Sequence, residues 1–65
     1  MATQTTRTNS NRVGDLELSR ASGREAARHE EKAAHTTGAE RDFHLRHAVD
    51  ARACEAQFAA WAAAA

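Results

Sequence analysis

A single break divides this chain into two helix-favouring segments of similar length. The break is the run Thr37-Gly38-Ala39-Glu40, which matches a Thr-x-x-Glu capping box with Thr37 as the N-cap. Proline is absent, and alanine, the strongest helix former, occurs 17 times. Because no longer linker separates the segments, we predict an all-α fold. It is an antiparallel two-helix hairpin with helices over about 14–36 and 38–63.

The first segment separates small residues from charged ones. At about 100° per residue, its small side chains fall on one side of the helix, and such a surface lets another helix approach closely. We call this side the small-residue face; its members are Leu16, Ser19, Ser22, Gly23, Ala26, Ala27, Ala33 and Ala34. The expected core or interface positions among them are Leu16, Gly23, Ala26, Ala27 and Ala34.

The second segment carries large apolar side chains in two rows. The first row, the aromatic stripe, contains Phe43, His47, Ala51, Cys54, Phe58 and Trp61. We expect the stripe to pack on the small-residue face as the hairpin core, or to meet a partner. A weaker row on another side, interrupted by Arg52, contains Leu45, Ala48, Val49, Ala56, Ala59 and Ala60, and its candidates for contact with a partner are Leu45, Val49, Ala56 and Ala60. A two-helix hairpin covers only one of these sides, so the second row predicts a partner.

Large apolar residues are scarce for a hairpin that folds alone. Only seven of the 65 residues are Leu, Ile, Val or Phe, which is below the roughly 20% at which chains usually build a core. Nine basic and nine acidic side chains cancel, so the high net charge typical of disordered chains is absent. We therefore expect a helical chain that completes a bundle with a twin or a larger protein partner.

The N-terminal residues differ in composition from the rest. Residues 1–12 are rich in Thr and Asn and contain no acid. This is typical of a flexible polar tail, and the alternative is an extended arm that becomes ordered along a partner. The predicted organisation is an arm over 1–12 and a helical hairpin over 13–65.

Three features bear on location. No apolar stretch follows Met1, so no secretory signal is expected. The longest nearly apolar run, 58–65, is too short to span a membrane. A single cysteine cannot form an internal disulfide, which favours a reducing compartment. We expect a cytoplasmic protein or part of an intracellularly assembled particle.

Glu30 and His47 are candidates for a polar pair. Glu30 is the one charge on the small-residue face, His47 lies in the aromatic stripe, and a turn near 37–38 places them at the same level. We expect a buried, hydrogen-bonded pair that sets the register of the helices. The alternatives are a catalytic or metal-binding pair, or two residues that both stay exposed.

The sequence shows only weak signs of a metal site or a catalytic site. The four histidines lack the repeated Cys/His spacing of zinc sites and the Glu-x-x-His motif of di-iron bundles, so we expect no metal and no cofactor. Cys54 is expected to be a buried structural thiol. No catalytic triad spacing, phosphate-binding loop or pair of catalytic carboxylates is present, and we expect no enzymatic activity.

A basic row recurs at four-residue spacing on the first segment and consists of Arg20, Arg24, Arg28 and Lys32. Three glutamates interleave with it, which favours a solvated face, and contact with phosphates is the alternative. In length and helix count the chain is similar to the small RNA-binding hairpins of the Rop type, which dimerise into four-helix bundles. No residue motif is shared with them.

The leading functional hypothesis is a non-enzymatic protein–protein interaction subunit that docks on or within a larger assembly. The alanine- and arginine-rich composition is typical of a GC-rich bacterium or its phage, where such a subunit would be a minor virion protein or an adaptor. One alternative is a homodimeric four-helix-bundle regulator that binds nucleic acid through the basic row. The other is a small inhibitor that places the aromatic stripe in a target's groove.

Overall fold

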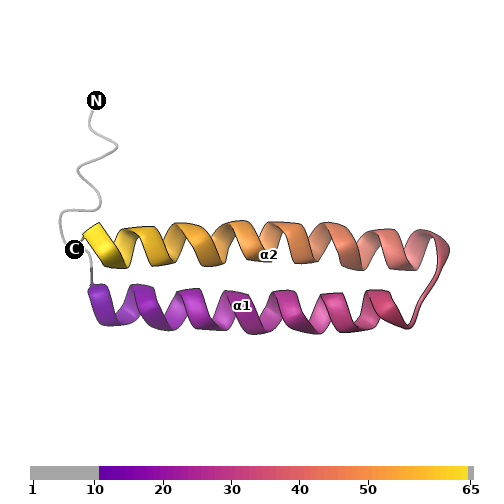
Figure 1. The fold of residues 1–65 in the computed structure, drawn as a ribbon, viewed down its shortest axis with the longest axis horizontal. Helices are drawn as coiled ribbons and strands as arrows, with labels where there is room; N and C mark the ends of the chain where they lie inside the picture. Colours follow the sequence, from indigo (N-terminus) through magenta and orange to yellow (C-terminus); the bar gives the residue numbers. More distant parts are fainter. Residues whose placement is uncertain (1–10, 65) are drawn as a thin grey trace, which may run out of the picture.

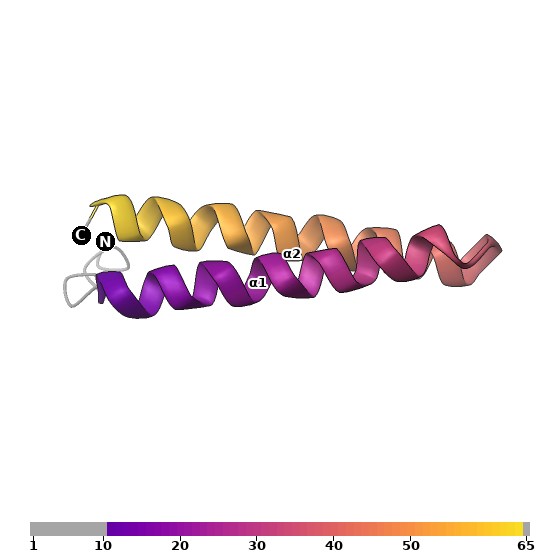
Figure 2. The same cartoon turned by 60° about the horizontal axis from the view of Figure 1, so that its bottom comes forward.

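The computed structural model describes residues 11–64, which form two helices, α1 (Arg12–Ala34) and α2 (Gly38–Ala64). The helices lie side by side and run antiparallel, with a short turn at one end (Figures 1 and 2). The predicted all-α hairpin is confirmed, and its helix boundaries differ from the expected ones by no more than two residues. Completion of a bundle by another chain stays a prediction. The predicted arm lies outside the described residues except for Asn11 and Arg12.

The start of α1 is fixed by a side-chain cap. Asn11 has an extended backbone, and its Oδ1 accepts a hydrogen bond of 3.0 Å from the Gly14 N–H. The Asn11 carbonyl accepts a second bond of 2.8 Å from the Asp15 N–H. A carboxylate in the first helical turn also faces the positive end of the helix dipole, so local chemistry alone favours a helix start here.

The turn between the helices depends on Gly38, whose φ is +65°. This left-handed conformation is strained for any residue with a Cβ, and glycine adopts it freely. The predicted capping box is not formed, because Gly38 reverses the chain at the position that the box needs in helical conformation. Among residues 11–64, neither the Thr37 nor the Glu40 side chain bonds to the backbone. The Glu40 carboxylate instead lies 3.9 Å from Nε2 of His44.

The seam between α1 and α2 is small and polar. Its positions repeat with alternating spacings of four and three residues in each helix, which is the heptad pattern of coiled coils. The buried members are Asp15, Ser19, Ala26, Ala33, His44, Ala48 and Ala62. Among the described residues, no large side chain is fully buried.

Small seam residues allow the helix backbones to approach closely. The Ser19 hydroxyl donates a hydrogen bond of 2.9 Å to the Glu55 carbonyl oxygen on the other helix. At Gly23, a Cβ would lie only 2.6 Å from Oε2 of Glu55. The hairpin therefore packs alanine, serine and glycine against each other, with no aromatic layer between the helices.

This packing corrects the predicted orientation of α2. The helix turns His44, Ala48 and Ala62 toward α1, and the aromatic stripe lies mostly on one flank. Close contact between the helices leaves the rings of Phe43 and Trp61 on the flank, and His44 is the one ring residue that is buried in the seam of the described residues. In the stripe Ala51, Phe58 and Trp61 are half-buried, whereas Phe43, His47 and Cys54 are exposed. On α1, Ala26 is buried, Leu16 and Gly23 are half-buried, and Ala27 and Ala34 are exposed. The expectation of a buried Cys54 thiol is therefore wrong.

Candidate functional site

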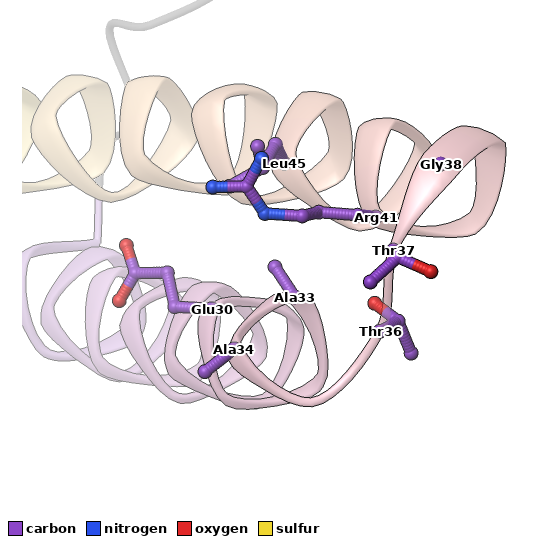
Figure 3. A pocket seen from close by; sticks show the side chains of 8 residues that line it. All are labelled: Glu30, Ala33, Ala34, Thr36, Thr37, Gly38, Arg41 and Leu45. Carbon is purple, nitrogen blue, oxygen red and sulfur yellow. The ribbon is translucent and has the colours of Figure 1, made fainter.

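The flank of the hairpin opposite the aromatic stripe carries an apolar groove that both helices line. Glu30 and Ala34 of α1 and Arg41 and Leu45 of α2 surround its first part, near the turn (Figure 3). The second part is lined by Glu30, Leu45, Ala48, Val49 and Arg52. Because the two parts share Glu30 and Leu45, they form one continuous groove along the molecule.

The groove continues into a larger surface, whose residues recur at helical spacing on both helices. On α1, Leu16, Gly23 and Ala27 lie on the same side as Glu30 and Ala34, with Arg20 among them. On α2, alanines follow Val49 and Arg52 on the corresponding side. We call this surface the apolar face; it consists of Leu16, Gly23, Ala27, Ala34, Leu45, Val49, Ala56 and Ala60. Leu45, Val49, Ala56 and Ala60 of the predicted second row of α2 lie in it and are exposed, whereas Ala48 of that row is buried in the seam.

One ion-pair network crosses the apolar face. Arg52 donates two hydrogen bonds to the Glu30 carboxylate, at 3.0 and 2.8 Å, and a third of 3.0 Å to Glu55. The hydrogen bonds from Arg52 lower the pKa of the Glu30 carboxyl. Those from Glu30 and then Glu55 raise the pKa of Arg52. The charges are matched in a bidentate geometry that holds α1 to α2.

The predicted Glu30–His47 pair is therefore wrong. Glu30 faces Arg52 on one flank of the hairpin, whereas His47 lies on the other flank. The His47 ring packs there at centroid distances of 4.2 Å from Phe43 and 5.1 Å from His29. The rotation of α2 that brings alanines into the seam moves these two residues apart.

We expect Glu30→Gln to destabilise the hairpin at neutral pH and to have little effect in acid. The folded pKa of Glu30 is lowered, so its contribution is present above the unfolded pKa and is lost as the pH falls through the folded value. Both side chains are half-exposed, so the effect is small and screened by salt. Thermal unfolding of both proteins at pH 7 and at about pH 3 measures it. An equal difference at both pH values would contradict the role of this carboxylate.

A histidine pair joins the helices on the opposite flank. Nδ1 of His29 lies 2.9 Å from Nδ1 of His44, so one ring donates the proton and the other accepts it. The outer nitrogens face carboxylates: Glu25 is 3.2 Å from Nε2 of His29, and Glu40 is 3.9 Å from Nε2 of His44. Hydrogen bonds from Arg28 and then His29 lower the pKa of Glu25. The four side chains form a carboxylate–imidazole–imidazole–carboxylate chain across the seam.

Sequence reasoning missed the histidine pair because it assigned the interior to His47. A usable signal was present in the heptad spacing. Position 29 falls between Ala26 and Ala33, and position 44 precedes Ala48 by four residues, so the alanine seam includes both histidines. Within residues 11–64, no group of three or more His, Cys, Asp or Glu side chains is arranged to hold a metal ion.

No matching protein-family model, curated protein or solved structure is found. Neither described helix has an apolar stretch sufficient to cross a membrane.

The basic row lies exposed along α1. Arg28 pairs with Glu25 one turn before it. Arg20, Arg24 and Lys32 make no ion pair with any residue in 11–64. Three of the four cations thus remain open to an anionic ligand.

Proposed function

We propose that this chain is a non-enzymatic protein–protein interaction subunit, a helical hairpin that docks on another protein surface. The proposal rests on which residues of the hairpin are buried and which are exposed. The seam is made of alanine, serine, aspartate and histidine, whereas the chain's larger apolar side chains face outward. The exposed large apolar residues are Val13, Leu18, Phe43, Leu45 and Val49.

The exposure of these large apolar side chains affects the stability of the hairpin. Covering one exposed Leu, Val or Phe side chain stabilises by roughly 1.5–3 kcal/mol, and a seam of alanines supplies much less area per residue. The groove through Leu45 and Val49 is already shaped by both helices. A protein partner that fills it therefore stabilises the hairpin as it binds.

The full chain in dilute buffer tests this proposal. We expect a broad, weakly cooperative thermal transition, and strong quenching of Trp61 fluorescence by a soluble quencher. Raising the protein concentration, or adding the partner, should sharpen the transition and raise its midpoint. A sharp transition that is independent of concentration, with Trp61 shielded in the dilute chain, would overturn the proposal.

Binding of nucleic acid is a second candidate, and the unpaired cations of the basic row favour it. Retention on heparin separates the two functions, because contacts to phosphate weaken steeply with salt. Salt-sensitive retention that Arg20→Glu with Arg24→Glu abolishes would favour nucleic acid. Absence of retention favours the protein partner.

A further inference from the structure

We propose that the apolar face binds a second copy of this chain, related by a two-fold axis parallel to the helices. The product is a four-helix bundle with both turns at the same end. This inference rests on the proposed function and names the partner at its groove. Three properties of the face carry it: the placement of large and small residues, the position of its charges, and the direction of its helices.

Large and small residues of the face are complementary between copies. The Ser19–Glu55 and His29–His44 contacts set the register of the two helices. In this register Val49 lies at a level between Gly23 and Ala27, and Leu45 lies one turn nearer the bend, between Ala27 and Glu30. A two-fold axis parallel to the helices places α2 of one copy over α1 of the other at unchanged levels. Leu45 and Val49 of each copy then both lie against Ala27 of the other.

At the open end of the hairpin a large residue again lies opposite an alanine, but here the large residue belongs to α1 and the alanine to α2. There the large residue, Leu16, comes from α1, and the alanine at its level, Ala60, comes from α2. The same axis places Leu16 of each copy over Ala60 of the other. Each large side chain of the face therefore meets a small one, which is how packed helix layers interdigitate.

Charge distribution selects this axis over the alternative. With the axis parallel to the helices, Arg52 of one copy comes near Glu30 of the other, so that unlike charges approach each other across the interface. An axis perpendicular to the helices would stack α2 on α2 in reverse. Arg52 lies near the middle of α2 (Gly38–Ala64), so two fully overlapping hairpins would bring their Arg52 guanidinium groups together. Like charges in contact are strongly disfavoured.

The size and polarity of the face also suit two copies. All neighbouring helices run antiparallel in the proposed bundle, so their dipoles oppose each other favourably. At 1.5 Å per residue the helices are roughly 35–40 Å long, and both contribute along their length. That is sufficient for the roughly 800 Å² per partner of a standard interface. The chain has zero formal net charge, so the copies do not repel each other overall.

Sedimentation of the full chain tests the interface with a matched pair of variants. Leu45 on the face is 38% exposed, and Leu18 on the opposite flank is 49% exposed, so Leu45→Glu and Leu18→Glu make the same change in similar surroundings. We expect the unaltered chain and Leu18→Glu to form dimers. Leu45→Glu should weaken the dimer by roughly a hundredfold, because it buries an unpaired carboxylate. Dimers that survive Leu45→Glu, or that both changes weaken equally, would overturn the assignment of this face.

The orientation is tested without altering the face. Thr37→Cys in a Cys54→Ser background carries a spin label in the turn, and pulsed dipolar spectroscopy measures the distance between labels in the full chain. Labels close together support the parallel axis. Labels a hairpin length apart, about 40 Å, would overturn it.

The state of the unaltered chain separates failure of the inference from failure of the proposed function. A weakly folded monomer at all concentrations would overturn the second copy as partner and leave a different protein partner required. A stable, cooperatively folded monomer would overturn both.

Discussion

Ala26→Leu is expected to lower the free energy of unfolding by roughly 1–3 kcal/mol, the range for overpacking a well-filled core. Ala26 is 0% exposed and lies in the seam one turn from Gly23. The Glu55 side chain lies over Gly23 next to it, and the Ser19 hydroxyl reaches the Glu55 carbonyl oxygen of the other helix two turns away. A leucine at position 26 is expected to push the helices apart, so the effect spreads along the seam.

Ala53→Leu is the matched control for this prediction. Ala53 is exposed on α2, and an exposed substitution of one good helix former by another changes stability by less than about 0.5 kcal/mol. Chemical denaturation followed by circular dichroism, at one protein concentration for all variants, measures both changes. Similar losses for the two variants would show that the seam is not closely packed.

His44→Ala is expected to lower the free energy of unfolding of the hairpin. The 2.9 Å contact between Nδ1 of His29 and Nδ1 of His44 is a hydrogen bond between the two helices. Removal of the His44 ring leaves the inner nitrogen of His29 without this partner and leaves a gap in the seam.

The size of this effect follows from the position of the pair. His44 is buried and His29 is half-buried, and loss of a buried hydrogen bond with an unsatisfied group costs roughly 1–3 kcal/mol. Glu25 and Glu40 face the outer nitrogens of the two rings, so the loss of His44 also removes the contact with Glu40.

His35→Ala is the control, since His35 is exposed and its side chain contacts Glu31 one turn earlier on the same segment of the chain. Thermal unfolding of the two variants and the unaltered chain at one pH and one protein concentration measures the difference. If His44→Ala and His35→Ala lower the midpoint equally, the ring-to-ring hydrogen bond does not contribute to stability.

The sequence by itself determined the number of helices, their approximate ends and their antiparallel direction. These properties follow from local preferences: alanine and the absence of proline favour helix, Asn11 caps α1, and Gly38 permits the reversal at φ +65°. The row of Leu45 and Val49 was also visible as a surplus apolar side, because its spacing alone places it on one side of a helix.

Only the tertiary structure decided how α2 is rotated about its axis. Apolar periodicity favoured the aromatic stripe as the core, since it counts the hydrophobicity of each side chain and not the distance between two backbones. When helices pack as closely as Ser19 and Glu55 show, alanines fill most of the seam, and the rings of Phe43 and His47 stay exposed on its flank. This rotation of α2 buries His44 and exposes Cys54. It also makes Arg52, and not His47, the partner of Glu30. Each of these outcomes depends on pairs of residues from different helices, which no local pattern specifies.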